Sequence, residues 1–246
     1  MSNEVVKKMD IRTFIGSDKV KEQIAKALPS VCTPDRFLRV AMTAVTKNAK
    51  LGTCDQASFI SCLLDCAQLG IEPDGRRAHL IPFNNRKENR VDCQLIIDYK
   101  GLVELVMRSG KVSNIHADKV CENDTFIYDT GSVSHKVDFS KPRGKVYCYF
   151  AKATFKDGST KCEVMTVEEI EKIRQASLGK NSTPWQSHFD EMAKKTVFRR
   201  LAKWLPLSPE DAMKLDDIEA REFSFDMPTT KAQELPKPDF VAIDKE

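Results

Sequence analysis

The order in which apolar periodicities follow one another constrains the fold of this chain more than any other sequence feature. The first third has helical spacing, as in 34–49, where apolar side chains recur three and four residues apart. The centre alternates with the two-residue period of strands at 78–83, at 91–98 and again between 111 and 165, and helical spacing then returns. This order predicts an α+β fold with a small antiparallel sheet flanked by helices, because a parallel sheet requires alternating strands and helices.

Capping residues mark several expected helix ends. Thr33 followed by Pro34 is typical of a helix start. Thr166 and Glu169 have the spacing of a capping box, which predicts a helix directly after the strand-like run TKCEVM. We also expect one continuous helix over 184–205, between two prolines.

Charge is distributed unevenly along the chain. Residues 1–205 carry 34 Lys and Arg against 25 Asp and Glu, a net charge of +9, whereas 206–246 carry 5 against 11, a net charge of −6. We therefore expect a basic body over 1–205 and a C-terminal part over 206–246, consisting of a helix and an acidic, proline-containing tail. The basic body favours a polyanionic partner, although a solvated surface with uneven charge explains the same counts.

Several classes of protein are disfavoured by the sequence. No apolar run approaches the roughly 18 residues that a membrane helix needs, and the N-terminus lacks a signal-peptide core, so we expect a cytoplasmic protein without membrane partners. The eight cysteines are scattered without a CxxC pair, which favours reduced thiols over a disulfide framework or a zinc site. No P-loop or dinucleotide-binding glycine motif occurs, so we expect neither an ATP-driven motor nor a bound cofactor.

One short pattern is compatible with an enzyme. Pro73-Asp74 lies upstream of Asp98-Tyr99-Lys100, as in the metal-nuclease pattern PD…(D/E)xK. In that pattern two carboxylates hold a divalent ion and a lysine positions the water nucleophile. A Pro-Asp-Gly turn, together with an aspartate that caps the next helix, explains the same residues without any chemistry. A Mg-dependent nuclease using Asp74, Asp98 and Lys100 is therefore the alternative function.

Basic residues follow one side of the last helix expected in the body. Lys195, Arg199 and Lys203 are four residues apart and so share a helix face, which Arg200 borders, whereas Lys194 is expected to point away from it. Cations on one face can neutralise successive phosphates of a nucleic acid. A solvated helix face is the other explanation.

Further cations and rings occur in the centre of the chain. On the helix expected after residue 99, Lys100 and Arg108 share a face with Glu104, and Lys111 follows the closing glycine. Other basic residues gather at the tip of the first hairpin, namely Arg86, Lys87 and Arg90. On a later strand two tyrosines alternate with a lysine, namely Lys145, Tyr147 and Tyr149. Interleaved rings and cations suit single-stranded nucleic acid, because cations meet phosphates and flat rings stack on bases.

Four ordered blocks, between about Leu28 and Pro206, resemble the RecT family of phage single-strand annealing proteins. They are LPSVCTPDRFLRVAMT, CLLDCAQLGIEPDGRRAHLIPF, IIDYKGLVELVMRSGKV and PWQSHFDEMAKKTVFRRLAKWLPLS. The resemblance implies a protein that coats single-stranded DNA, forms a filament or ring of identical subunits, and anneals complementary strands without ATP or catalytic residues. It implies a DNA-binding groove between the sheet and a helix.

The resemblance also implies partners and contacts. The partners are single-stranded DNA, annealed duplex, a 5′→3′ exonuclease and a host single-strand binding protein, in the cytoplasm of a bacterium that carries the phage or prophage. The segments DYKGLVELVMRSG and KKTVFRRL are expected to face DNA. Phosphate contacts are expected from Lys100, Arg108, Lys111, Lys195, Arg199, Arg200 and Lys203. Weaker contacts to sugars or bases are expected from Tyr99, His79, Gln94 and Asn114, and further contacts from Arg86 and Arg90. We expect no metal ligand. A general RNA-binding surface is a third possibility, although the usual RNA-binding signatures are missing.

Overall fold

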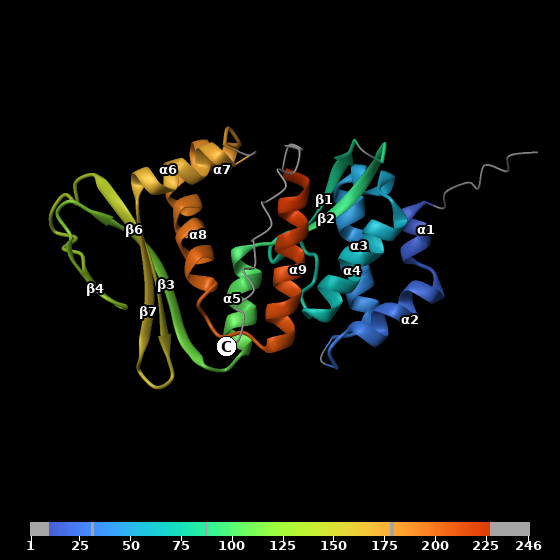
Figure 1. The fold of residues 1–246 in the computed structure, drawn as a ribbon, viewed down its shortest axis with the longest axis horizontal. Coiled ribbons are helices and arrows are strands. Elements are labelled where there is room, and N and C mark those ends of the chain that lie inside the picture. The colour runs from blue at the N-terminus through green and yellow to red at the C-terminus, as the bar shows by residue number, and fades with distance from the viewer. Residues whose placement is uncertain (1–9, 31, 87, 178–179, 227–246) are drawn as a thin grey trace, which may run out of the picture.

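The structure, a computed structural model, describes residues 10–30, 32–86, 88–177 and 180–226, with side chains up to residue 218. Helices α1 to α4 gather at one end of an elongated molecule, a three-stranded sheet lies at the other end, and α5, α8 and α9 lie between them (Figure 1). All strand pairs are antiparallel. The predicted α+β class is confirmed, with the strands divided among one three-stranded and two two-stranded sheets.

The helical end is built from amphipathic helices and one hairpin. Its elements are α1 (Ile11–Ile15), α2 (Asp18–Ala27), α3 (Pro34–Lys47), the 3₁₀ helix η1 (Ala49–Thr53), α4 (Gln56–Gln68), β1 (Ala78–Asn85) and β2 (Arg90–Ile97). The predicted start of α3 at Pro34 is confirmed. The Asp55 carboxylate accepts hydrogen bonds from the first backbone N–H groups of α4 and so caps that helix.

The sheet end has two layers. Its strands are β3 (Val112–Cys121), β4 (Thr125–Asp129), β5 (Ser132–Lys136), β6 (Val146–Phe155) and β7 (Thr160–Thr166). The three-stranded sheet has the order β3-β6-β7, and β4 pairs with β5 in a separate hairpin. Because side chains alternate along a strand, Tyr149 and Ala151 of β6 belong to the main core, whereas Cys148 and Phe150 form a small second core with the hairpin.

The remaining helices are α5 (Tyr99–Arg108), α6 (Val167–Ala176), α7 (Thr183–Ser187), α8 (Phe189–Ala202) and α9 (Pro209–Asp226). The capping box that starts α6 is confirmed. The prediction of one continuous helix over 184–205 is wrong, because His188 has a non-helical backbone (φ −136°, ψ 48°). The break lets the ring of Phe189 pack against both Trp185 and Tyr149, with centroid distances of 5.7 and 6.3 Å.

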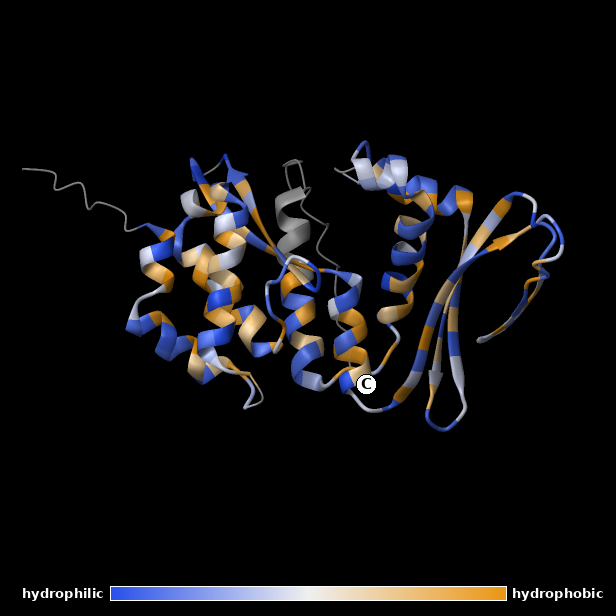
Figure 2. Cartoon of the chain, turned by 180° about the vertical axis from the view of Figure 1, so that it is seen from behind, coloured by the Kyte–Doolittle hydropathy of each residue, from blue (hydrophilic) through white to orange (hydrophobic). Residues whose placement is uncertain are grey.

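One continuous apolar core runs from α1 to α9 and includes Leu215 and Ile218 of α9. The C-terminal helix therefore packs on the body, and the division of the chain at Pro206 stays a prediction. Apolar and polar residues alternate around the helices (Figure 2), as burial of one face requires. Within the described residues, none of the helices is long and apolar enough to cross a membrane.

Candidate nucleic-acid interface

A cavity of about 250 Å³ lies between α5, β3 and α8. It is lined by Tyr99, Val103, Ile115, Ala117, Glu191, Lys194, Lys195 and Phe198. The helix α8 packs on the three-stranded sheet, and α5 lies beside it. The fold thus brings the two segments that were predicted to face DNA to opposite walls of one groove, although about 95 residues separate them in the sequence.

The Tyr99 ring lines this cavity and has two cations near it. The Nζ atoms of Lys195 and Lys100 lie 5.0 and 5.8 Å from the ring centroid, within the range of a cation–π contact. The Asp98 carboxylate caps α5 and lies 3.5 Å from the Lys195 Nζ. Burial works to raise the pKa of Asp98, but the hydrogen bond to His79 and the charge of Lys195 outweigh it and lower that pKa. The site therefore has one half-buried aromatic ring, two ammonium groups and one ionised carboxylate.

Gly101 fixes the position of Tyr99. A Cβ at residue 101 would lie 2.5 Å from the backbone oxygen of Arg77 and 2.9 Å from the Ile97 side chain, closer than real contacts allow. The first turn of α5 therefore packs directly against the segment before β1. A side chain at this position would displace the end of α5 that carries the tyrosine.

The prediction that Lys194 points away from the groove is wrong. Lys194 lines the same cavity as Lys195, and its Nζ lies 2.6 Å from the Glu191 carboxylate. The face of α8 that meets α5 is wide enough for positions i, i+3, i+4 and i+7, here 191, 194, 195 and 198. The cavity beside Tyr99 therefore contains a lysine that the four-residue spacing did not predict.

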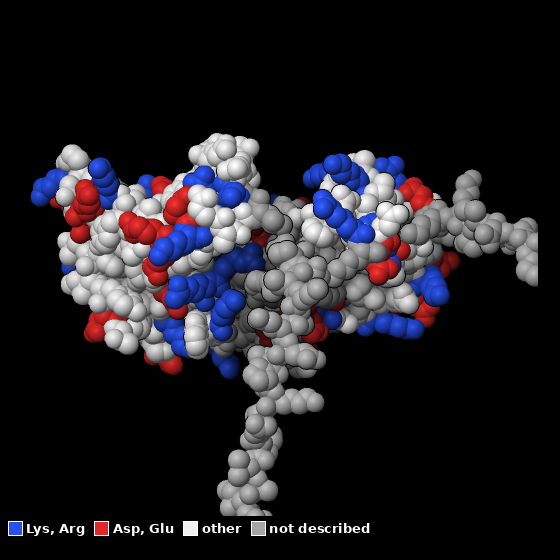
Figure 3. Space-filling view, turned by 45° about the horizontal axis from the view of Figure 1, so that its top comes forward, with Lys and Arg blue, Asp and Glu red and all other residues white. Residues whose placement is uncertain are grey.

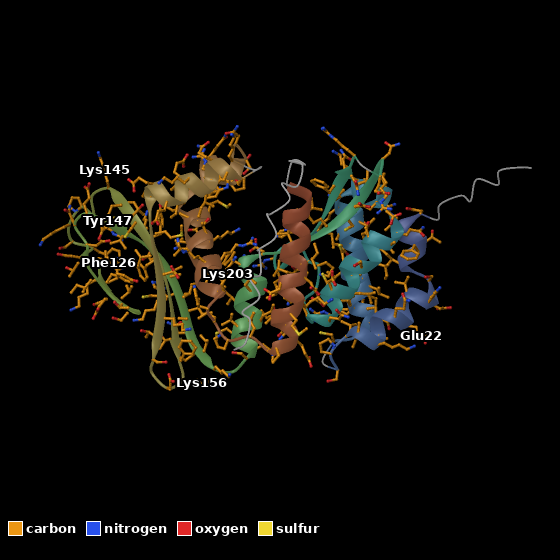
Figure 4. All side chains as sticks on the ribbon, viewed as in Figure 1. Glu22, Phe126, Lys145, Tyr147, Lys156 and Lys203 are labelled. Carbon is orange, nitrogen blue, oxygen red and sulfur yellow. The ribbon has the colours of Figure 1, made fainter. Side chains whose placement is uncertain are left out.

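The other predicted cations of α8 lie in different surroundings. Arg199 and Lys203 line a second cavity of about 290 Å³, between α5, α8 and α9, together with Asp216. Figure 4 shows Lys203 on the side of α8 nearest to α5. Arg200 lies 3.4 Å from Glu163 of β7, on another side of the helix. The predicted stripe is thus divided between an open cavity, the acidic helix α9 and the edge of the sheet.

Arg108, at the C-terminal end of α5, forms hydrogen bonds within the fold. The Arg108 guanidinium donates to the backbone oxygens of Leu69 and Gly70, at 2.6 and 3.3 Å, and to Glu104 at 3.0 Å. It therefore closes the end of α4 and does not point into the cavity beside Tyr99. Lys111 is exposed beyond this same end of α5.

The hairpin β1–β2 carries exposed basic residues at its tip. Arg86 is exposed, and the Arg90 Nε donates to the buried carboxylate of Asp92 at 2.8 Å. Lys87 lies outside the described residues. The tip is therefore basic at Arg86, whereas part of the charge of Arg90 is neutralised.

The predicted base or sugar contacts are divided between two surfaces. His79 and Gln94 lie on the half-exposed face of the hairpin, and the His79 Nε2 lies 3.7 Å from the Asp98 carboxylate. Asn114 lies on β3 one residue before Ile115, which lines the cavity, so it belongs to the face of the sheet away from α8. The structure brings His79 near Tyr99 and places Asn114 elsewhere.

The predicted alternation of tyrosines on β6 is half wrong. Tyr147 is exposed near Lys145 at the outer end of the sheet (Figure 4). Tyr149 is 1% exposed, and its hydroxyl donates to Asp190 of α8 at 2.5 Å. Because the side chain of Tyr149 faces the core, its ring cannot stack on a base.

The residues of the nuclease pattern form a turn and a helix cap. Asp74 accepts hydrogen bonds from the backbone N–H groups of Arg76 and Arg77, both at 2.8 Å, and from the Arg77 Nε at 2.9 Å. Gly75 has the positive φ (+74°) that such a turn requires. The turn interpretation of Asp74 is therefore confirmed. In the part of the chain that the structure describes, no cluster of three His, Cys, Asp or Glu side chains could hold a metal ion.

Arg76 is a candidate residue that the sequence reasoning missed. It is exposed and lines a cavity of about 380 Å³ with Lys100, Asp74 and Arg77, at the N-terminal end of α5. The sequence signal that could have indicated Arg76 is the pair of arginines that directly follows the Asp74-Gly75 turn. The Asp74 side chain binds the Arg77 guanidinium, and the Arg76 side chain remains exposed beside Lys100.

The surface charge agrees with these positions. In Figure 3 lysines and arginines gather in a hollow over α8 and α5, and a second basic group lies over the β1–β2 hairpin. A phosphate backbone that followed the hollow would meet cations from several elements.

Comparison with known proteins agrees with the resemblance. The model of the RecT family matches residues 35–230. Protein RecT of Escherichia coli (strain K12) is 40% identical over 223 residues, covering 87% of this chain and 82% of that protein. This chain belongs to the RecT family. The uncharacterized protein YqaK of Bacillus subtilis (strain 168) is 24% identical over 217 residues, covering 86% of this chain and 73% of that protein.

The RecT family match is longer than the blocks quoted from the sequence. It continues past Pro206 into α9, which packs on the body. Both walls of the cavity beside Tyr99 lie within it. The site is therefore part of the region that this chain shares with its family.

Proposed function

We propose that this RecT-family protein binds single-stranded DNA in the cavity between α5, β3 and α8 and anneals complementary strands without ATP. The observation that carries the proposal is the Tyr99 ring in the lining of that cavity, with the ammonium groups of Lys195 and Lys100 at 5.0 and 5.8 Å from its centroid. Family membership supports the annealing activity, and the geometry supports this location for the strand.

The chemistry of the site suits annealing. Two polyanionic strands approach one another only when cations neutralise their phosphates, while the base edges must stay free to pair. Lysines meet phosphates as point charges, and a tyrosine face stacks on any base. We therefore expect weak sequence preference, with Lys100, Lys194 and Lys195 as the principal phosphate contacts and Arg76 and Arg86 as outer contacts.

Assembly follows from the size of the site. A cavity of about 250 Å³ holds few nucleotides, so stable coating of a strand requires neighbouring subunits. We propose a filament or ring of identical subunits on DNA. The 5′→3′ exonuclease and the host single-strand binding protein are proposed partners that supply and cover the single strand.

An annealing assay tests the proposal. Two complementary labelled oligonucleotides are mixed with the protein, without nucleotide and with or without magnesium. We expect faster pairing of strands that keep their full length, and slower pairing with Lys195→Ala. Strands shortened in magnesium by the wild type, but not by Asp74→Ala, would instead establish the nuclease. Pairing no faster than without protein would refute annealing.

A further inference from the structure

The chain contains two tryptophans in opposite environments. Trp185 is 7% exposed in the core, whereas Trp204 is 65% exposed directly after the last turn of α8. The backbone of Trp204 is held in place, because its N–H donates to the Leu201 oxygen at 2.9 Å. A large apolar ring thus remains in water on a fixed backbone, where aromatic side chains typically serve binding.

Cations lie near Trp204 in the structure and in the sequence. The Lys161 Nζ of β7 donates to the backbone oxygen of Trp204 at 3.0 Å, which fixes an ammonium group beside the residue. Arg200 lies one helical turn earlier and is half-exposed opposite Glu163. Lys203, the preceding residue, is also exposed. Three cations and one carboxylate near an exposed tryptophan make a surface with net positive charge, which attracts anions.

Trp204 and Lys195 lie on different sides of α8. At about 100° per residue, the nine residues between them make two and a half turns, so the indole lies about half a turn away from the Lys195 side that contacts the Tyr99 ring. Trp204 therefore lies on the side of α8 that meets β7, where Lys161 and the Arg200–Glu163 pair are found.

We propose that the Trp204 indole stacks on a nucleobase of single-stranded DNA, on the side of α8 that meets β7. The inference rests on the proposed function. It adds a second stacking position, at the end of α8, that the sequence motifs did not indicate. A contact between subunits would also use an exposed tryptophan, but the cores of such interfaces are depleted in lysine, whereas Lys161 binds the backbone of Trp204 and Lys203 precedes it.

Tryptophan fluorescence tests the proposal. Wild type, Trp204→Phe and Trp204→Ala are titrated with a thymidine 20-mer and with a 20-mer of the same charge that lacks bases. We expect the thymidine strand to quench wild-type emission and to leave Trp204→Phe, which reports only Trp185, nearly unchanged. Trp204→Ala should bind the thymidine strand roughly 5- to 100-fold more weakly, and the abasic strand as the wild type does.

Three results would overturn the proposal. The first is Trp204→Ala binding the thymidine strand as tightly as wild type, and the second is equal quenching by the abasic strand. The third is an emission shift that follows protein concentration without DNA, which would assign Trp204 to a subunit contact. If one of these three results is seen and Lys195→Ala still weakens binding in the same titration, the proposed groove stands and only the Trp204 proposal fails. If wild type binds neither strand, the proposed function itself fails. Equal urea midpoints for the three proteins check that the variants are folded.

Discussion

The two ends of α5 carry similar basic residues and use them differently. At the C-terminal end, the Arg108 guanidinium donates to two backbone oxygens and to Glu104. At the N-terminal end, Lys100 and Lys195 lie over the Tyr99 ring, and the nearest carboxylate to Lys195 is Asp98 at 3.5 Å. In the sequence all of these residues are equally plausible phosphate contacts.

The difference follows from the acceptors that surround each cation. A planar guanidinium with several donors suits fixed carbonyl and carboxylate groups, so an arginine near them becomes part of the fold. Arg77 behaves in the same way, with ion pairs to Glu72, Asp74 and Glu104 at 2.8 to 3.0 Å. An ammonium over a ring has few fixed acceptors and can still meet a phosphate.

The largest expected effect is on stability, from Arg77→Ala. The substitution leaves three partly buried carboxylates without their partner, so we expect the free energy of unfolding to fall by about 2–3 kcal/mol. Urea unfolding measures this change. A loss below about 0.5 kcal/mol, as for an ordinary surface residue, would contradict the structural role assigned to this arginine.

The ion pair between Arg143 and Asp124 predicts that the free energy of unfolding falls in acid. The hydrogen bond from Arg143 lowers the pKa of the buried Asp124 carboxylate far below its ordinary value, although burial opposes the shift. The stabilisation is complete above the unfolded pKa of about 3.9 and is lost as the pH falls toward the folded pKa. Urea unfolding at pH 7 and pH 3 should therefore show a smaller difference for Asp124→Asn than for wild type. Equal differences would refute the linkage.

Lys194→Ala should weaken binding of single-stranded DNA severalfold, because the lysine lines the cavity beside Tyr99. The matched control is Lys26→Ala, an exposed lysine of α2 that also pairs with a glutamate on its own helix. Affinities are compared by titration at one salt concentration. Equal effects of the two substitutions would mean that Lys194 does not contact DNA.

The smallest expected effect is an increase in affinity for single-stranded DNA. Glu191→Gln removes the carboxylate that pairs with Lys194, so we expect DNA binding to tighten by about twofold. Glu22→Gln, at the far helical end of the molecule (Figure 4), changes a charge that pairs with Lys26 and should leave affinity unchanged. Weaker binding by Glu191→Gln would mean that the glutamate orients the lysine for the phosphate.

Local signals predicted most of the fold. The proline after Thr33, the capping box at Thr166 and the alternation on each strand depend on neighbouring residues, and the structure has the corresponding elements. The break at His188 was missed because its cause is packing of Phe189 against Trp185 and Tyr149, and Tyr149 lies 40 residues away in the sequence.

The site was less predictable for the same reason. Helical spacing placed Lys195 and Arg199 on one face of α8, but it could not show that α9 lies beside Arg199 and not beside Lys195. Nor could it show that the Arg108 guanidinium donates hydrogen bonds to the backbone carbonyls at the end of α4. Which cations remain for a ligand depends on acceptors from distant segments.

The most direct test compares the salt dependence of single-stranded DNA binding for wild type, Lys195→Ala and Arg108→Ala. Each phosphate contact on a single strand contributes about 0.7 to the slope of log K against log salt. We expect Lys195→Ala to lower the slope by that amount and Arg108→Ala to leave it unchanged while lowering the urea midpoint. A slope that falls for Arg108→Ala and not for Lys195→Ala would contradict the assignment of the two ends of α5.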